Sequence, residues 1–527
     1  MNFRLSWLLP LLLLPLAGCR TPSSPPAATT PSPTNAASTP LRLVVSFPQA
    51  VRSTPVQGRV LLFLSRTAGG EPRTQMDWFD PDPVFALEVN SLCPDDLLVF
   101  LPDKFKKPDA LAFPKPLGQL PPGTYYAQAL IDVDQTRRDF NQGPGNLYSR
   151  PLRVELKGDL GATYALIADQ IVPEPEYVET EWVKFVKVRS SLLSQFSGRD
   201  VFLQASVLLP FGYASEPERH YPALYTIPGF GGRHDSALQV PKRKGEHWSD
   251  WSTGKKPFRG FEIILDPDVP LGHSVWANSA NNGPVGDALI QELIPAIEQC
   301  FRIIPEARAR FVGGHSSGGW SSLWLQVNYP ETFGGCWSTA PDPVDFRSFQ
   351  TMNIYADLNG FWTPEGQPRP VARTRYEPRL TFVRMNHWEY VLGYGGQLDS
   401  FDAVFSPRTA EGHPQRLMNK LTGVIDPAVA EYWKRYDIRL LLQNHWGELG
   451  PKLKGKLHVI AGAWDTFYLE PAVERLKAFL DTTDHGGYVE ILPGDHGSFY
   501  DAEFKARIYR EIAEQVAKAS PGAKVTP

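Results

Sequence analysis

One serine of this sequence stands in a setting that favours nucleophilic chemistry. In RFVGGHSSGGWSSLW, residues 310–324, Ser316 lies between Gly314 and Gly318, after one apolar run and before another. The first run predicts a strand and the second a helix, and a serine on the sharp turn between them is typical of a nucleophile elbow. Flanking glycines would allow the close backbone approach that such a turn needs. The alternative is a flexible glycine-serine loop, because roughly 0.2 chance matches to G-x-S-x-G are expected in a chain of this length.

A serine hydroxyl becomes a strong nucleophile only when a base takes its proton and a third group orients that base. The elbow arrangement predicts an acid and then a histidine later in the chain. The run VIAGAWD ends in Asp465, and VEILPGD is followed by His496. Both residues come just after predicted parallel strands, where open α/β sheets carry their sites. We therefore predict Ser316 as the nucleophile, His496 as the base and Asp465 as the carboxylate that orients the imidazole.

Other acids and histidines compete for these roles. His485 comes before the last predicted strand, and His458 lies inside a strand, where a packed core histidine is the usual case. Asp495 adjoins the candidate histidine, but the side chains of neighbouring residues rarely reach one another productively. Glu470 already belongs to the next predicted helix. The two residues at the strand ends are therefore preferred.

Acyl transfer also needs backbone N–H groups that stabilise the oxyanion of the tetrahedral intermediate. The amide of Ser317, which follows the nucleophile, is one predicted donor. The turn PGFGG at 228–232, after an earlier apolar strand, supplies the other predicted donor at the amide of Phe230. The alternative for this second segment is a plain glycine turn without a chemical role.

Composition and cysteine spacing exclude several function classes. The 527 residues carry 53 Lys and Arg against 57 Asp and Glu, with a net charge of −4 and no basic block, so no nucleic-acid partner is expected. No C-x-x-C or H-E-x-x-H spacing occurs, so neither a metal nor another cofactor is predicted. Apart from Cys19, the chain has Cys93, Cys300 and Cys336. One Cys300–Cys336 bridge is allowed, but buried free thiols are favoured for an odd number.

The first residues indicate a targeting segment. Arg4 precedes a short apolar run that cannot span a membrane, which is typical of a signal peptide covering residues 1–18. The following LAGC resembles the bacterial lipobox and implies lipidation of Cys19, whereas an ordinary signal peptide would make this cysteine incidental. Residues 19–40 are rich in Pro, Ser, Thr and Ala and predict a disordered tether. We therefore expect an exported protein of the cell envelope, lipid-anchored to a bacterial membrane on its periplasmic or cell-surface side.

The rest of the chain divides into two predicted regions. Residues 41–175 contain short apolar or alternating runs separated by turn-rich stretches, which predicts an all-β, immunoglobulin-like sandwich. Its expected role is structural, with a lid support or a binding module as alternatives. Residues 176–527 alternate strands and helices, which predicts an α/β domain with a mostly parallel sheet and helices on both faces.

A long segment at 342–453 interrupts this second region with weak strand signals and many aromatic residues. A connection of this length is usually functional or carries its own substructure. It is either surface decoration or a cap that lines a substrate pocket. The aromatic candidates for such a lining are Trp362, Trp388, Tyr390 and Tyr394.

Several of these stretches resemble the putative-esterase branch of the α/β-hydrolases, which includes esterase D-like, feruloyl-esterase-like and enterochelin-esterase-like enzymes. VFLQASVLLPFGYASEPERHYPALYTIPGFGG resembles the opening strand pair and oxyanion turn of that branch, and GGHSSGGWSSLWLQVNYPETFGG resembles its elbow. The usual His-Gly of the oxyanion turn is here Pro228-Gly229. Matched residue by residue, the resemblance implies the roles already given for Ser316, Asp465, His496, Phe230 and Ser317.

The predicted protein is thus a serine hydrolase of carboxylic esters, whose partners are a small or polymer-linked ester and, through its lipid, a membrane. One alternative is a carbohydrate- or polymer-binding surface protein with an inactive hydrolase domain. Another is acyl transfer or peptide cleavage on the same fold.

Overall fold

The computed structural model describes residues 40–519, apart from 76, 103, 105–109, 135, 159–160 and 243–245. The expected signal peptide at 1–18, the lipidated Cys19 and the tether as far as residue 39 lie outside the described residues. Within the described part of the chain, no helix combines the length and the apolar character that crossing a bilayer requires.

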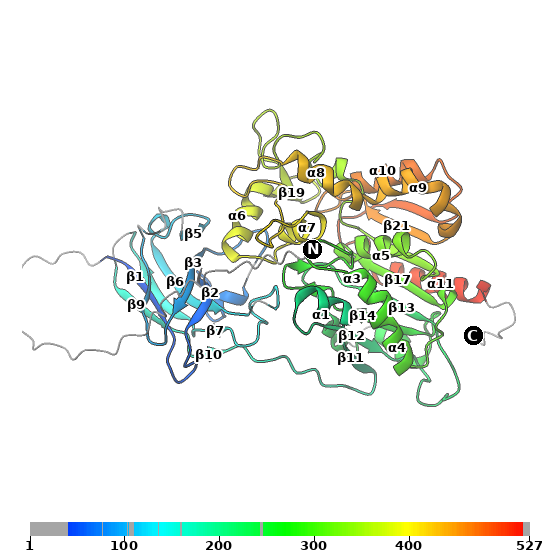
Figure 1. Ribbon diagram of the computed structural model, residues 1–527, viewed down its shortest axis with the longest axis horizontal. Coiled ribbons are helices and arrows are strands. Elements are labelled where there is room, and N and C mark those ends of the chain that lie inside the picture. Colours follow the sequence, from blue (N-terminus) through cyan, green and yellow to red (C-terminus); the bar gives the residue numbers. More distant parts are fainter. Residues whose placement is uncertain are drawn as a thin grey trace, which may run out of the picture.

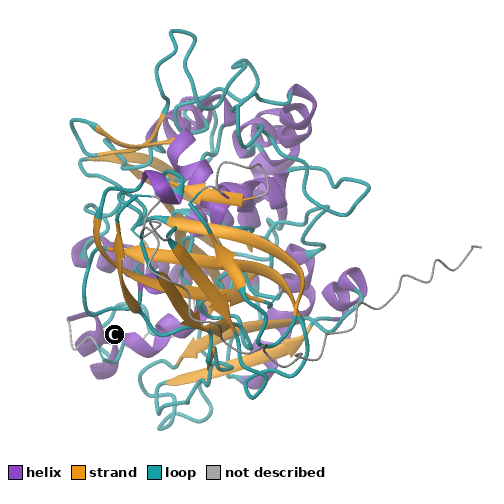
Figure 2. Cartoon of the chain, turned by 90° about the vertical axis from the view of Figure 1, so that its left-hand side faces the viewer, coloured by secondary structure: helices purple, strands orange, loops and turns teal. Residues whose placement is uncertain are grey.

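The N-terminal region, which we call the β-domain, consists of two sheets (Figures 1 and 2). One has the strand order β4-β1-β9, and the other has the order β10-β7-β6-β2-β3-β5 with β8 paired to β6. The strands confirm the all-β character that the short apolar and alternating runs of residues 41–175 predict. The immunoglobulin-like type stays a prediction. The strands are β1 (Arg42–Ser46), β2 (Val56–Ser65), β3 (Val84–Leu92), β4 (Leu98–Phe100), β5 (Ala110–Phe113), β6 (Gly123–Asp132), β7 (Leu147–Tyr148), β8 (Leu152–Leu156), β9 (Thr163–Ile167) and β10 (Gln170–Ile171).

Both faces of the larger sheet are covered, which explains the continuous apolar run of β2. Val60 and Leu62 join the buried cluster shared by the two sheets of the β-domain. Leu61 and Phe63 point to the other face and pack in a second cluster with Trp388, from a helix more than 300 positions later in the chain. Successive strand residues face opposite sides, so a strand buried on both sides reads as uninterrupted apolar sequence. The β-domain is therefore packed against the large domain rather than tethered beside it.

The large domain is built on an eight-stranded sheet with the order β11-β12-β14-β13-β17-β18-β21-β22. Strand β12 is antiparallel to both neighbours, and the remaining pairs are parallel, which confirms the predicted mostly parallel sheet. The strands are β11 (Val183–Arg189), β12 (Phe202–Leu208), β13 (Ala223–Ile227), β14 (Phe261–Leu265), β17 (Arg310–His315), β18 (Gly335–Thr339), β21 (Leu457–Gly462) and β22 (Tyr488–Leu492), with the two-stranded β15 (Asp268–Val269) and β16 (Gly272–His273) beside them.

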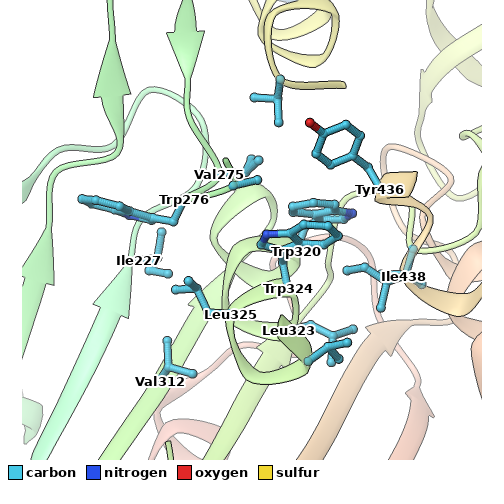
Figure 3. Packing of buried hydrophobic residues seen from close by; sticks show 14 of the residues in the cluster. Ile227, Val275, Trp276, Val312, Trp320, Leu323, Trp324, Leu325, Tyr436 and Ile438 are labelled. Carbon is cyan, nitrogen blue, oxygen red and sulfur yellow. The ribbon is translucent and has the colours of Figure 1, made fainter. Parts of the chain in front are cut away.

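Helices cover both faces of this sheet (Figure 1). Two neighbouring residues of β13 pack on opposite faces of the sheet. Tyr225 packs in the cluster that contains Leu323 of α5, and Leu224 packs in the cluster that contains Ile508 of α11. In Figure 3, Trp320, Leu323 and Trp324 of α5 pack together in the first cluster. The helices are α1 (Ser191–Ser197), α2 (Glu246–Thr253), α3 (Val285–Ala288), α4 (Ile294–Cys300), α5 (Ser317–Asn328), α6 (Phe382–Leu392), α7 (Gln397–Phe405), α8 (Pro427–Trp433), α9 (Ile438–Leu453), α10 (Glu470–Leu480) and α11 (Ala502–Ala519), and a π-helical turn, Leu289–Leu293, joins α3 to α4.

The regular elements of the segment at 342–453 are mostly helices, which the weak strand signals did not indicate. It contains α6 to α9 and a two-stranded sheet of β19 (Pro370–Arg373) and β20 (Pro378–Thr381). Every residue of α7 is buried, including Asp399 and Asp402. Their carboxylates pair with Lys420 and Arg416, with Asp399–Lys420 at 2.7 Å and Asp402–Arg416 at 3.2 Å. The buried face of an amphipathic helix normally carries apolar residues. Because buried ion pairs put charged residues on such faces, the apolar residues of this segment do not show a clear helical spacing.

The cysteines differ in state. Cys300 and Cys336 are both free thiols, so no bridge joins them, and Cys336 is buried as expected. Cys300 is exposed, so the expectation of a buried thiol is wrong there. Cys93 is disulfide-bonded, so the expectation of a free thiol is wrong for it.

Candidate active site

Ser316 lies on the turn between β17 and α5, as the sequence predicts. Its backbone has φ 62° and ψ −125°, a strained conformation for a residue with a side chain. A Cβ on Gly318 would come within 1.9 Å of the Ile227 carbonyl oxygen, and one on Gly314 within 2.2 Å of the Gly318 carbonyl oxygen. The two glycines of the motif are therefore required by backbone contact, and the turn is not a loose glycine-serine loop.

Asp465 and His496 meet at the same edge of the sheet, beyond the ends of β21 and β22. The imidazole Nδ1 of His496 donates to Oδ2 of Asp465 at 2.8 Å, and Oδ1 accepts the amide of Phe467, also at 2.8 Å. Asp465 is fully buried, while the His496 side chain keeps 16% of its surface exposed. His315, the residue before Ser316, packs its ring 4.6 Å from that of His496. The pair of His496 and Asp465 therefore lies beside the residue that precedes Ser316.

The charges around His496 favour the protonated form of its imidazole. Burial alone lowers the pKa of His496, but the carboxylate of Asp465 outweighs burial and raises the pKa overall, with further contributions from Asp342 and Asp495. His315 differs, because burial and the nearby positive charges lower its pKa to about 3. The Thr339 hydroxyl donates to the Gly314 carbonyl, so it accepts the Nδ1 proton of His315. The second histidine is thus a neutral neighbour.

The turn at 228–232 lies directly against the serine. A Cβ on Gly229 would be 3.2 Å from the Ser316 Cβ, so a side chain at this position would crowd the serine. Among the described residues, no hydrogen-bond acceptor engages the amide of Phe230 or that of Ser317. Both predicted oxyanion donors therefore keep free N–H groups on turns that adjoin Ser316.

A histidine from outside the oxyanion turn, His273, supports this turn. The resemblance would instead place a histidine within the turn, at position 228. Nδ1 of His273 accepts the amide of Val275 at 3.0 Å, so the ring proton is on Nε2 and is donated to the Pro228 carbonyl, also at 3.0 Å. Burial lowers the pKa of this histidine to about 4, which keeps it neutral. Sequence reasoning missed His273, which no spacing connects to the turn.

Asp342 is a second buried acid near the serine that sequence reasoning did not single out. Its amide donates to the Ser316 carbonyl, and its Oδ2 accepts the Ser317 hydroxyl at 2.5 Å and Nε2 of Gln397 at 3.3 Å. Burial raises its pKa to about 6, against the lowering effect of the Ser317 hydrogen bond. Its place directly after β18 is a signal that the strand-end rule could have found. The bond also gives the Ser317 hydroxyl a structural role.

The competing candidates lie elsewhere or have other partners. His458 is buried in β21, where Nδ1 donates to the Cys336 carbonyl at 3.0 Å and the ring stacks on Trp337. Asp495 accepts the amides of two residues that follow it, in a tight turn. Glu470 pairs with Arg373. The His485 carbonyl accepts the amide of Gly455, and this residue comes before β22 begins, at the opposite end of that strand.

Two of the four aromatic candidates line a cavity beside the site. A cavity of about 420 Å³ is bordered by Trp388 and Tyr394, together with Phe230 of the oxyanion turn. Trp362 and Tyr390 do not border it, and their side chains are partly exposed. Among the residues that the structure describes, no group of three or more His, Cys, Asp or Glu side chains is arranged to hold a metal ion.

Comparisons with solved structures return esterases of low similarity. A ferulic acid esterase is 12% identical, with 64% of this chain and 99% of that chain covered and a TM-score of 0.40. An S-formylglutathione hydrolase from Agrobacterium tumefaciens is 13% identical, with 63% and 95% covered and a TM-score of 0.38. A ferulic acid esterase from Anaeromyces mucronatus is 14% identical, with 64% and 93% covered and a TM-score of 0.33. At these identities and scores the likeness adds nothing to the argument about function.

No curated protein matches the chain. A family model described as Putative esterase matches residues 276–388, the segment that carries Ser316 and α5. The resemblance drawn from the sequence is therefore confirmed over this segment, which is similar to the putative-esterase branch of the α/β-hydrolases.

Proposed function

We propose that this protein is a serine esterase that hydrolyses carboxylic esters through an acyl-enzyme on an α/β-hydrolase fold. Nε2 of His496 takes the proton of the Ser316 hydroxyl as its oxygen attacks the ester carbonyl. The amides of Phe230 and Ser317 donate to the oxyanion that forms. His496 then gives the proton to the leaving alcohol, and the carbonyl re-forms as an acyl group on Ser316.

The second half of the reaction reverses these roles with water as the nucleophile. His496 removes a proton from a water molecule, which attacks the acyl carbon, and the proton returns to Ser316 as the carboxylic acid leaves. Asp465 remains ionised and keeps the proton of the neutral imidazole on Nδ1, so that Nε2 is the basic nitrogen in both halves. These steps need no group beyond the residues named and the substrate.

The observation that carries the proposal is the 2.8 Å bond between His496 and Asp465 beside the strained turn of Ser316. The buried aspartate, the partly exposed histidine and the serine come from three separate strand ends, and the segment with the serine matches an esterase family. An acyltransferase or a peptidase would use the same groups, and an inactive binding protein would retain them without turnover. Export and a lipid on Cys19 remain proposals from the sequence.

The pH dependence of ester hydrolysis tests the proposal. Because the reaction needs a neutral His496 and the pKa of this histidine is raised, kcat/KM should fall on the acid side with a midpoint above about 6.5, the ordinary imidazole value. We expect this fall in kcat/KM at acid pH with p-nitrophenyl acetate as the substrate and free acetate as a product. The release of nitrophenol is followed at its isosbestic wavelength.

Three outcomes would contradict the proposal. Undiminished hydrolysis at pH 5.5 would exclude His496 as the base. Transfer of acetyl groups to an added alcohol, with little free acetate, would indicate an acyltransferase. An absence of turnover across a panel of esters would favour the binding protein.

A further inference from the structure

The cavity beside the oxyanion turn is built from parts of the chain that are far apart in sequence. The large domain contributes Phe230 from the turn, and Trp388 and Tyr394 from the segment at 342–453. The β-domain contributes Trp78 and Arg138 to the same lining. Phe230 follows Gly229, on which a Cβ would lie 3.2 Å from the Ser316 Cβ, so one lining residue of the cavity belongs to the turn that adjoins the candidate nucleophile.

Two residues of the β-domain contact the side chain of Phe230. The Trp78 ring lies 5.5 Å from the Phe230 ring, and the Arg138 guanidinium carbon is 4.6 Å from the centre of that ring. Trp78 also lies 6.3 Å from Phe467, whose ring packs edge-on at 4.9 Å against His496. One tryptophan of the β-domain thus reaches both the turn that bears the oxyanion donor and the residue packed on the base.

Buried ion pairs and hydrogen bonds fix the two domains in this position. Nε of Arg138 donates to Asp268 at 2.8 Å, and both side chains are about nine-tenths buried. Arg233, which follows the oxyanion turn, donates to Gln142 of the β-domain at 3.0 Å and to Asp266 at 3.0 Å. Breaking one member of such a buried pair is costly, so the interface keeps its geometry.

The lining indicates the kind of group that the cavity would accept. Trp78, Phe230 and Trp388 offer flat apolar surfaces, and the charge of Arg138 is already balanced by Asp268. Asp139 borders the cavity as a carboxylate, which disfavours an anionic guest. Glu389 lies at the same wall, and burial raises its pKa to about 8, which favours the neutral acid. An uncharged group with a flat apolar face fits this lining best.

We propose that the β-domain completes the active site: Trp78 and Arg138 form one wall of a substrate pocket that binds the larger, uncharged and flat group of the ester. The statement that this pocket binds part of an ester rests on the proposed esterase function. It gives the β-domain a direct part in substrate selection, in addition to the structural role expected from the sequence.

Three esters measure the selection that this wall provides. Ethyl acetate has no large group, methyl benzoate has a large acyl group, and benzyl acetate has a large alcohol. The wild-type protein should prefer one of the two bulky esters. Trp78→Ala should lower kcat/KM for that ester about 10-fold more than it lowers kcat/KM for ethyl acetate, because one aromatic contact contributes a free energy of about this size. Trp78→Phe, which keeps a flat ring, should recover most of the preference. Arg138→Ala should act in the same direction as Trp78→Ala.

Matched controls lie in the same domain. Arg137→Ala removes an adjacent arginine whose partner is Glu174, within the N-terminal region, and Leu97→Ala removes an exposed apolar side chain. Both should leave the preference at the wild-type value, and thermal unfolding should show that all variants are folded. An unchanged preference in folded Trp78→Ala and Arg138→Ala would overturn the inference while ester hydrolysis stands.

Binding separates this inference from the proposed function. The amide N-benzylbenzamide carries both flat groups and resists hydrolysis, and calorimetry on full-length Ser316→Ala protein measures its affinity without turnover. Adding Trp78→Ala should weaken binding about 10-fold. If no ester is hydrolysed but this loss appears, the esterase proposal fails and the pocket stands. Equal affinity in both proteins, or no binding to Ser316→Ala, would overturn the pocket.

Discussion

Replacing Ser316 by alanine is expected to lower kcat for p-nitrophenyl acetate by at least about 10⁴-fold, with the fold intact. The hydroxyl forms the acyl-enzyme, and no neighbouring group can take over that covalent step. Position 316 has a positive φ, which alanine tolerates no worse than serine, so circular dichroism and thermal unfolding should match the wild type. The measurement is single-turnover and steady-state release of nitrophenol from both proteins.

A serine of the helix that follows Ser316 provides the control. Ser322 is buried in α5 and donates to the Gly319 carbonyl at 2.9 Å, without contact to the candidate site. Ser322→Ala should keep kcat within a few-fold of the wild type. If Ser316→Ala kept comparable activity, the nucleophile would have to be another residue, and the account of the elbow would be wrong.

The second large effect is expected from Asp465→Asn, which should lower kcat by about 10⁴-fold while KM changes little. An asparagine at 465 can present its NH₂ group to Nδ1, which favours the tautomer with the proton on Nε2 and removes the base. The substitution also removes the main cause of the raised pKa of His496, so the acid limb of the residual activity should move to lower pH. Steady-state kinetics between pH 5 and 9 measure both effects.

Two further substitutions show whether Asp465 is the acid of the site. Asp495→Asn alters the residue next to His496, whose carboxylate accepts backbone amides of its own turn, and should cost only a few-fold in kcat. Asp342→Asn removes the acceptor of the Ser317 hydroxyl and should cost less than Asp465→Asn, with the acid limb displaced less. The assignment would be contradicted if Asp342→Asn or Asp495→Asn gave the larger loss.

The central sheet and the elbow could be predicted because the local sequence requires them. Continuous apolar runs such as those of β17 and β21 are typical of parallel strands covered on both faces. The glycines around Ser316 are demanded by contacts with backbone atoms that belong to the same motif and its neighbouring strand. The order of serine, aspartate and histidine then follows from the order of the strands.

The remaining features depend on contacts between distant segments, which leave no local pattern. In the sequence, Trp78 lies in a loop, and it contacts Phe230 only because the β-domain packs against the large domain. His273 supports the oxyanion turn from a short strand 45 positions later in the chain. The helices α6 and α7 were missed because α6 faces another domain and α7 buries ion pairs, so neither shows a simple amphipathic stripe.

The central claim is that Ser316 is an activated nucleophile, and labelling with a fluorophosphonate tests it most directly. The probe phosphonylates a serine that a base has activated, and peptide mass spectrometry locates the adduct. We expect one adduct on Ser316 of the folded protein, formed much more slowly by Asp465→Asn and not formed after unfolding in urea. An adduct on another residue, or none on folded wild-type protein, would contradict the account.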